Sequence, residues 1–276
     1  SEADVDAVLD RLQALNVDFV KITDNTLKPE LFLYAVSQAK ARGMKTSGHI
    51  PMELTVLQAA EAGLSTIEHL NYLMKAGSRE EAQISADYIA GKLTYAEAMA
   101  RYAETFDEEV ALRTYRRLAQ LGVMASPTQH GSSLIARLDS ADHSNDRELA
   151  YVGPGIVATY DWRVERSKQA TPEMVRARHF VEEVTLKTLP LLRQAGVRIL
   201  AGTDAGYLNS YNYPGFSLHD ELALYVANGL TPREALEASI INGPALMGLS
   251  ANYGAVEAGK VADLLVLESN PLEDIA

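Results

Sequence analysis

Two stretches of this sequence decide its fold: Gly43-Met-Lys-Thr-Ser-Gly-His49 and Gly63-Leu-Ser-Thr-Ile-Glu-His69. In each, a glycine follows a run of helix-forming residues, a short apolar or β-branched run follows the glycine, and a histidine closes the run. Glycine suits the left-handed position just after a helix, and such a short run is typical of a strand buried on both faces. Each stretch therefore predicts a helix end, a strand and a polar residue at the strand's carboxyl end.

The same unit occurs three more times along the chain. These units run from Asn16 to Lys21, from Gly122 to Thr128 and from Gly196 to Asp204. Helices that alternate with buried strands are the pattern of parallel β-α-β units. The sequence thus predicts an α/β fold with a parallel sheet, either a closed barrel or an open doubly wound sheet.

Capping signals mark the helices between these strands. Pro29 suits the first position of a helix that ends before Gly43. Thr171-Pro172 opens another helix, which Pro190 should kink or divide. Thr231-Pro-Arg-Glu234 matches a capping box with proline in the first turn.

Two longer segments interrupt this rhythm, and the tail departs from it. Residues 71–121 exceed one crossover helix and are read as a helical insertion, while the weakly patterned residues 131–170 are read as a long loop. Residues 251–276 contain two short apolar runs joined across Gly259-Lys260, which is typical of a β-hairpin. We therefore predict a barrel portion over residues 1–250 and strands of a small separate sheet over 251–276.

The composition bounds the classes of function. Of 276 residues, 47% are hydrophobic and 22% charged, which excludes a disordered chain. The 25 basic and 37 acidic residues give a formal charge of −12, which argues against a nucleic-acid partner. The absence of cysteine excludes thiolate ligands and leaves the compartment, cytoplasm or periplasm, open. Since no apolar stretch approaches the roughly 20 residues of a membrane span, we expect a small-molecule substrate and no membrane partner, and leave homo-oligomer formation open.

The polar residues that close the strands form the candidate site. In parallel α/β folds, function sits at the carboxyl ends of strands, and this chain places Lys21, His49, His69 and Asp204 there. Two imidazoles and a carboxylate are ligands for zinc or another divalent metal. A lysine within an apolar run needs a charge partner, or it can be made an anion by carbamylation with CO₂, which supplies two oxygen ligands. Together the four residues predict a metal site.

Each of these residues also has a simpler role open to it. A single strand-end histidine is more often a hydrogen-bonded core residue, and Lys21 alone would be an ion-paired or snorkelling lysine. Asp204, in Gly-Thr-Asp-Ala-Gly, could be a turn former. The recurrence of polar residues at equivalent positions favours the functional role. Glu68 should point to the face of its strand opposite to that of His69 and is read as structural.

Three further residues are weaker candidates for substrate contact. His130 lies just past the fourth strand end, Tyr207 in the loop after the fifth, and His219 in the first turn of a helix. For His130 and His219, a loop role and a helix-surface role are equally open. His143 and His179, in a polar loop and a charged helix, are read as solvated.

These motifs together resemble the amidohydrolase superfamily, particularly its imidazolonepropionase-like and prolidase-like branch. The resemblance implies a (β/α)₈ TIM barrel of the metal-dependent hydrolase type with a small β-sandwich, of which this chain shows strands four to eight and the C-terminal part of the sandwich. It also implies one or two divalent metals, with zinc the first expectation. The motifs that carry it are Val20-Lys21-Ile22, Gly48-His49-Ile50-Pro51, Ile67-Glu68-His69-Leu70, Ala201-Gly202-Thr203-Asp204, and Gly259-Lys260-Val261-Ala262-Asp263-Leu264-Leu265-Val266-Leu267 followed by Asn270-Pro271-Leu272.

The resemblance implies a role for each strand-end residue. Lys21 would be the carboxylated lysine of strand four that bridges the metals, and His49 and His69 would be the ligands that end strands five and six. Asp204 would be the strand-eight ligand that also carries protons. The family's first-strand His-x-His pair occurs nowhere in this sequence. We therefore expect a C-terminal fragment, or a chain whose ordered part starts late, with little activity of its own.

The resemblance implies a metal-dependent hydrolase that cleaves an amide or peptide C–N bond of a small substrate with metal-activated water. The resemblance to this branch suggests dipeptides first as substrates, then N-acyl amino acids, and then cyclic amides. A non-catalytic barrel piece that binds metal weakly and serves in oligomer assembly is the alternative, favoured by the missing His-x-His pair. A metal-independent barrel enzyme that uses Asp204 and a histidine as base and acid leaves Lys21 unexplained.

Overall fold

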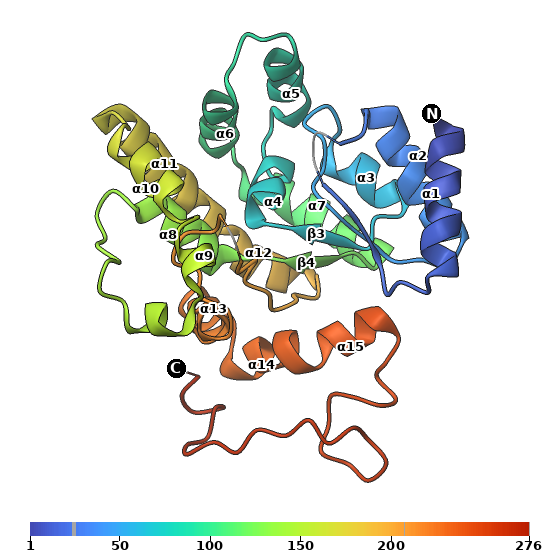
Figure 1. Cartoon of the computed structure of the whole chain (residues 1–276). Helices are drawn as coiled ribbons and strands as arrows, with labels where there is room; N and C mark the ends of the chain where they lie inside the picture. Colours follow the sequence, from blue (N-terminus) through green and yellow to red (C-terminus); the bar gives the residue numbers. More distant parts are fainter. Residues whose placement is uncertain (24–25, 207, 276) are drawn as a thin grey trace. The chain divides into compact units, whose positions relative to one another are not determined.

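The computed structural model describes residues 1–23, 26–206 and 208–275 of the chain. These residues fall into two compact units, and each is described by itself (Figure 1). The first unit comprises Ser1–Ser126 with Leu191–Ile199, and the second comprises Pro127–Pro190 with Leu200–Ala276.

Short parallel strands form the sheet of the first unit. Besides the four strands named at the end of this paragraph, the fifth predicted strand unit joins the sheet through one parallel bridge, between Ala125 and Ile199. All five predicted strand units thus lie in one parallel array, in the order of the chain, which confirms an α/β fold with a parallel sheet. The four strands, which pair in sequence order, are β1 (Val20–Ile22), β2 (Thr46–Gly48), β3 (Thr66–Glu68) and β4 (Met124–Ser126).

One face of this sheet packs against helices. Ile22, Gly48 and Ile67 are neighbours in the register of β1, β2 and β3. A Cβ atom added at Gly48 would come within 3.2 Å of Leu64 and 3.6 Å of Phe32, a fully buried residue of α2 (Pro29–Ala41). Because side chains alternate along a strand, the residues one position away on each strand face away from this helical layer.

The helices of the first unit begin and end where the local sequence signals them. Pro29 is in the first turn of α2, and the glycines Gly43, Gly63 and Gly122 adopt the left-handed backbone that closes a helix. Figure 1 shows α1, α2 and α3 side by side, as their contacts require. Besides α2, the helices are α1 (Glu2–Ala14), α3 (Val56–Ala62), α4 (Leu70–Ala76), α5 (Glu81–Ile89), α6 (Tyr95–Glu104) and α7 (Glu108–Leu121).

Helices make up the regular structure that is described in the second unit. Proline divides one of them as predicted, because α11 ends at Leu186 and α12, which contains Pro190 and extends into the first unit, begins at Thr188. The capping box at Thr231 is formed. The helices are α8 (Gln129–Arg137), the 3₁₀ helix η1 (Arg147–Tyr151), α9 (Pro154–Val157), α10 (Asp161–Lys168), α11 (Pro172–Leu186), α12 (Thr188–Ala195), α13 (Phe216–Ala227), α14 (Pro232–Ile240) and α15 (Asn242–Met247).

The segment 131–170, which the sequence predicts to be a long loop, is largely helical. It contains most of α8 and all of η1, α9 and α10, which are only 9, 5, 4 and 8 residues long. Helices this short give too few turns for an apolar period to be legible in the sequence. The loop prediction is wrong for this reason.

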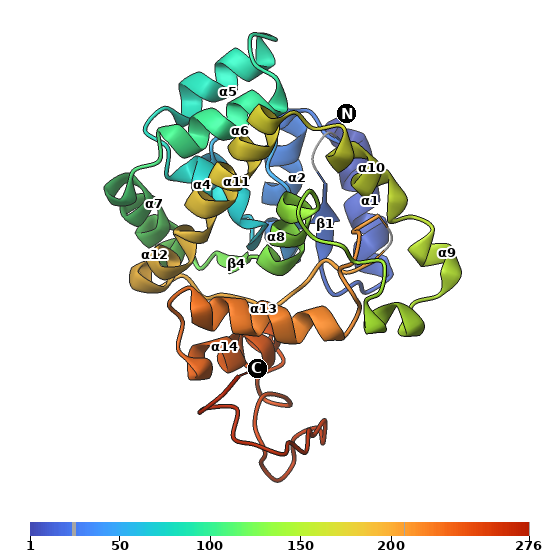
Figure 2. The ribbon, with the colours of Figure 1, turned by 90° about the vertical axis from the view of Figure 1, so that its left-hand side faces the viewer.

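The predicted C-terminal hairpin is not formed. Residues 251–275 contain no strand, and Figure 2 shows them as an irregular trace beyond α14. Val256, Leu265 and Val266 are 86%, 83% and 98% exposed. A hairpin alone is marginally stable in water, and no strand pairs with these runs in the part of the chain that the structure describes.

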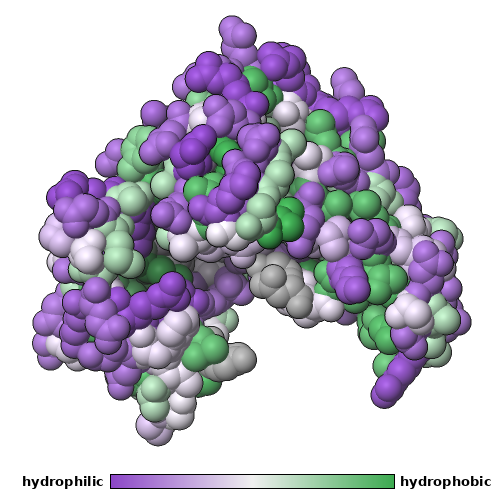
Figure 3. Space-filling model, turned by 90° about the horizontal axis from the view of Figure 1, so that it is seen from above, coloured by the Kyte–Doolittle hydropathy of each residue, from purple (hydrophilic) through white to green (hydrophobic). Residues whose placement is uncertain are grey.

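One face of the molecule can be judged by its hydropathy. Figure 3 shows hydrophilic residues predominating on the face seen from above, with apolar residues scattered among them. Within the described residues, no helix combines the length and the apolar character needed to cross a membrane.

Candidate functional site

Two histidines meet at the carboxyl ends of β2 and β3. The Nε2 atoms of His49 and His69 are 2.9 Å apart, and the ring centroids are 4.7 Å apart. The His49 N–H donates to the carbonyl of Ile22 at 3.0 Å, and the His69 N–H donates to that of Ser126 at 2.8 Å. Strand pairing therefore fixes the backbone of both residues, and the structure brings these two predicted ligands together.

The backbone of His69 is strained. Its φ of +64° lies in the left-handed region, directly before α4 begins. Thr128 and Asp204, which close two other predicted strand units, also have positive φ angles, +47° and +55°. Such a conformation costs a residue with a side chain on the order of 1–3 kcal/mol and tends to occur at functional sites. Three of the five strand-end polar residues share this property.

Tyr72 covers both imidazole rings. Its ring centroid lies 5.9 Å from that of His49 and 6.5 Å from that of His69, with interplanar angles of 29° and 31°. The residue is 7% exposed and lies in the first turn of α4, three positions after His69. Its ring therefore lies beside both imidazoles. The sequence analysis missed Tyr72, although an aromatic residue one helical turn beyond a strand-end histidine is the signal that could have found it.

Lys21 forms an ion pair with Glu68. Lys21 neighbours Ser47 in the register, and Ser47 neighbours Thr66, so all three lie on the sheet face directed away from the helices. The Lys21 Nζ is 3.3 Å from Glu68 Oε2, and the hydroxyl of Thr66 donates to Glu68 Oε1 at 2.8 Å. The lysine thus has a charge partner without carbamylation. Glu68 was predicted to be structural, and this contact was not foreseen, although Glu68 lies two positions after Thr66 and so on the same face as Lys21.

The described residues fit a bound cation in part. Two imidazole nitrogens at about 2.0–2.1 Å from one tetrahedral zinc ion lie about 3.3–3.4 Å apart. The His49 and His69 Nε2 atoms, 2.9 Å apart, would have to separate slightly to hold such an ion. Lys21 as an ammonium has no lone pair to donate. No three His, Cys, Asp or Glu side chains gather into a metal group among the residues that the structure describes. The histidine pair would supply two ligand positions to a cation, and the remaining ligands would have to come from other groups.

Asp204 lies in the second unit and is described within it. Its side chain is exposed, and the side-chain amide of Asn209 donates to the Asp204 carbonyl and, at 3.1 Å, to Oδ2. These bonds close a tight loop after the fifth strand unit. The turn-forming role of Asp204 is therefore visible, and its roles as ligand and proton carrier stay predictions.

His130 lies in the first turn of α8 beside a buried carboxylate. Glu221 of α13 is fully buried and accepts the backbone N–H of Gln129 at 2.8 Å and that of His130. Burial raises the pKa of Glu221, and the two N–H donors oppose that rise. Burial also lowers the pKa of His130, while Asp220, whose Oδ2 is 3.6 Å from Nε2, opposes the fall. Glu221 was not predicted from the sequence, because a single glutamate in an apolar helix can equally lie on the protein surface.

The remaining histidine and tyrosine candidates have different outcomes. His219 is exposed on α13, so the structure favours its helix-surface role. Tyr207 lies outside the described residues. His143 is not solvated as predicted: its side chain is 16% exposed, its Nδ1 is 2.8 Å from Asp146 Oδ2, and its ring stacks on that of Tyr211 at 4.6 Å.

Comparison with known sequences agrees with the motifs. A sequence model of the amidohydrolase family matches residues 11–276. An imidazolonepropionase of Pseudomonas syringae pv. tomato is 36% identical over 144 residues, which make up 49% of this chain and 31% of that protein. An imidazolonepropionase of Pseudomonas putida is 31% identical over 154 residues, 53% of this chain and 34% of that protein. The chain thus matches about a third of the length of these curated relatives.

Solved structures show the same fold. A Xaa-Pro dipeptidase with methionine bound in its active site has a TM-score of 0.62 at 21% identity, covering 99% of this chain and 54% of that chain. The bottromycin amidohydrolase has a TM-score of 0.65 at 21% identity, covering 91% of this chain and 52% of that chain. At such identities the likeness concerns the fold alone.

Proposed function

Since this chain belongs to the amidohydrolase family, in its imidazolonepropionase-like and prolidase-like branch, we propose that it acts in metal-dependent hydrolysis of a C–N bond in a small substrate. In this proposal the parallel array corresponds to strands four to eight of a (β/α)₈ barrel. In the proposed whole protein, residues 251–276 would gain pairing strands and contribute to a small β-sandwich. Because the chain spans about a third of its curated relatives, the activity belongs to the proposal for the whole protein.

The observation that carries the proposal is the 2.9 Å separation of the His49 and His69 Nε2 atoms. Two neutral imidazoles at this spacing can share one proton, or both can direct lone pairs at a cation. The strained backbone of His69 is more readily understood in the second case, because strain persists where function requires a geometry.

In this proposal each site residue of the chain has its own role. His49 and His69 hold the metal as neutral imidazoles, and Tyr72 keeps their rings oriented. Lys21 contributes two oxygens once carbamylated. Asp204 accepts the proton of the attacking water and returns it to the leaving amine. A divalent cation, when bound, lowers the pKa of its water and polarises the scissile carbonyl.

Metal content tests this proposal. The chain is purified without chelator, and its zinc is compared with that of His49→Ala/His69→Ala and of a control, His219→Ala, which alters an exposed histidine. We expect the double variant to lose its zinc and the control to keep it. Equal zinc in the wild-type chain and the double variant contradicts the proposed site.

Substrate assays separate two candidate reactions. Dipeptides and N-acyl amino acids are the first candidates, on the likeness to a Xaa-Pro dipeptidase. Ring opening of a cyclic amide is the second, and the 36% identity to an imidazolonepropionase favours it. A panel of dipeptides, N-acyl amino acids and a cyclic amide, tested with the whole metal-loaded enzyme, identifies the reaction by its product.

A further inference from the structure

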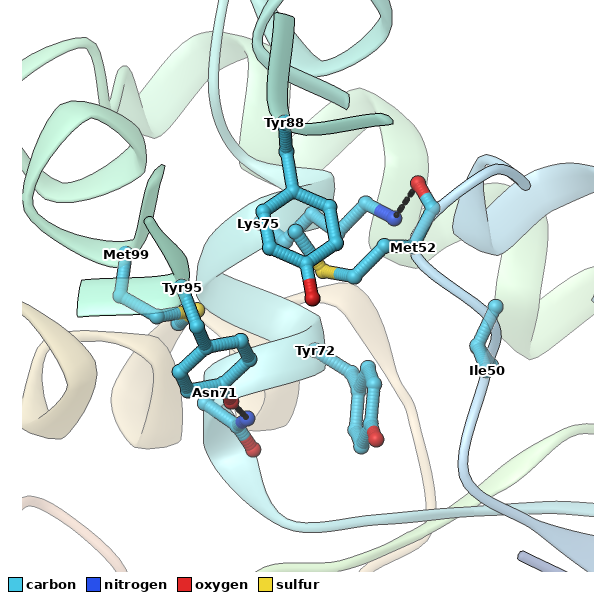
Figure 4. A pocket seen from close by; sticks show the side chains of 8 residues that line it. All are labelled: Ile50, Met52, Asn71, Tyr72, Lys75, Tyr88, Tyr95 and Met99. Carbon is cyan, nitrogen blue, oxygen red and sulfur yellow. Dashed lines mark hydrogen bonds between the residues drawn. The ribbon is translucent and has the colours of Figure 1, made fainter. Parts of the chain in front are cut away.

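A small pocket opens beside the histidine pair, between the loop that follows β2 and the helices α4, α5 and α6 (Figure 4). Tyr72, Tyr88 and Tyr95 line it with Met52 and Met99. The pocket is small and partly open to solvent, so it can admit the tip of one side chain and not a whole dipeptide.

Tyr72 connects the pocket to the proposed reaction centre. Tyr72 lines the pocket, and its ring centroid is 5.9 Å from that of His49 and 6.5 Å from that of His69. Ile50, which also lines the pocket, directly follows His49. A group in the pocket is therefore about one ring away from the imidazoles, close enough to belong to a substrate that reacts there.

The lining is aromatic and thioether in character. The rings of Tyr88 and Tyr95 meet edge to face, 6.4 Å apart, and two methionines complete the wall. Aromatic rings and polarisable sulfur favour contact with flat or sulfur-containing apolar groups. At the rim, the side-chain amide of Asn71 donates to the hydroxyl of Tyr95 at 3.3 Å. No carboxylate is among the described lining residues.

A buried positive charge lies at the floor. Lys75 is 1% exposed, and its ammonium donates to the carbonyls of Met52 at 3.1 Å and Leu54 at 2.7 Å, the first of which is drawn in Figure 4. Burial lowers the pKa of Lys75 to about 8, so the charge persists at neutral pH. Glu81 and Glu53 attract this charge, but neither lines the pocket. A cationic group entering the pocket would therefore meet a like charge and find no carboxylate.

We propose that this pocket is a subsite for an uncharged aromatic or thioether side chain of the substrate, and that Lys75 excludes cationic side chains from it. The inference rests on the proposed function, because a subsite has meaning only beside a reacting centre. It narrows the substrate class to amides of apolar amino acids such as phenylalanine or methionine.

Methyl NMR of the full chain tests the proposal without any catalytic step. The chain has seven methionines, and their methyl signals are followed while N-acetyl-phenylalanine amide, N-acetyl-methionine amide or N-acetyl-lysine amide is added. We expect the first two ligands to shift Met52 and Met99, with Met174 and Met247 of the second unit unmoved. Shifts by the lysine amide as large as those by the phenylalanine amide, or no shift of Met52 and Met99 by any ligand, overturn the subsite.

A variant of the pocket wall provides the matched comparison. Tyr88→Ala should weaken binding of N-acetyl-phenylalanine amide by about tenfold, the effect of losing ~1.4 kcal/mol of ring contact. Tyr151→Ala removes a tyrosine that is 76% exposed in the second unit and should leave binding unchanged. Met99→Leu conserves the apolar lining and should bind within about threefold of the wild type. Equal binding by Tyr88→Ala and Tyr151→Ala overturns the subsite.

Failure of the subsite is distinguishable from failure of the proposed function. Zinc bound by His49 and His69 together with no ligand-induced shift at Met52 and Met99 overturns the subsite alone. If both methionines shift but the zinc content is the same in the wild type and in His49→Ala/His69→Ala, the metal-dependent function alone is overturned.

Discussion

Lys75 donates a 2.7 Å hydrogen bond to the backbone carbonyl of Leu54. Lys75 belongs to α4, which begins directly after His69, whereas Leu54 lies five residues after His49. The buried ammonium thus ties together the two segments that leave the paired histidines. We infer that it helps to keep their imidazoles at the observed spacing.

Replacement of this lysine should reduce stability. Lys75→Met keeps the length of the side chain but leaves the carbonyls of Met52 and Leu54 buried without their donor, which typically costs about 1–3 kcal/mol per group. Urea unfolding at pH 7 measures the free energy of unfolding. A variant as stable as the wild type would show that the ammonium contributes nothing net.

The same lysine predicts a pH dependence. In the folded chain the pKa of Lys75 is about 8, below the ordinary value of 10.5. Between these two values the unfolded chain binds more protons than the folded one, so the free energy of unfolding should rise with pH. The wild type should therefore gain stability relative to Lys75→Met between pH 8 and pH 10. Parallel pH profiles of the two proteins contradict this expectation.

Metal removal should destabilise the first unit through the histidine pair. A ligand that binds only the folded state adds to its stability. We expect a chelator to lower the melting temperature of the metal-loaded chain by at least about 2–4 °C, which corresponds to ~1 kcal/mol at this size. His49→Ala/His69→Ala should melt at the same temperature with and without chelator. A chelator effect that survives in the double variant places the metal elsewhere.

Lys21 should be carbamylated in the metal-loaded whole enzyme and an ordinary ion-paired lysine in the metal-free chain. Mass spectrometry under mild conditions detects the added CO₂. Lys21→Arg keeps a cation for Glu68 but cannot form the carbamate, so it should retain stability and lose metal. Full metal content and activity in Lys21→Arg would remove the need for the modification.

Asp204→Asn distinguishes proton transfer from turn formation. Asparagine keeps an oxygen that can accept from Asn209, so the loop should survive, but it lacks a basic carboxylate. In the whole enzyme we expect kcat to fall by the ~10²–10⁴-fold typical of losing a general acid–base group, with a much smaller change in KM. Metal occupancy is measured in parallel. A nearly unchanged kcat with full metal leaves Asp204 as a turn former only.

Short local patterns in the sequence predict much of this architecture. Glycine after a helix, a β-branched run and a closing polar residue predict each strand unit, because backbone conformation depends on a few neighbouring residues. The same patterns place His49 and His69 at the ends of β2 and β3. Parallel pairing then brings the two residues to one edge of the sheet, which the sequence analysis could infer without coordinates.

Contacts between distant segments were decided only by the tertiary structure. The pairing of Lys21 with Glu68, the ring of Tyr72 over the histidines and the bond from Lys75 to Leu54 join residues on different elements. Which side chains meet depends on strand register and on how each helix packs. A local pattern can offer a candidate, such as Tyr72 one turn beyond His69, but it does not decide which contacts form.

Two of the failed predictions concern secondary structure. Residues 131–170 form helices too short to show a period, and residues 251–275 form no strand although their composition favours one. A strand is stable only when another strand satisfies its hydrogen bonds. The chain's own composition therefore determines where strands can form, and the tertiary structure decides which of them find a partner.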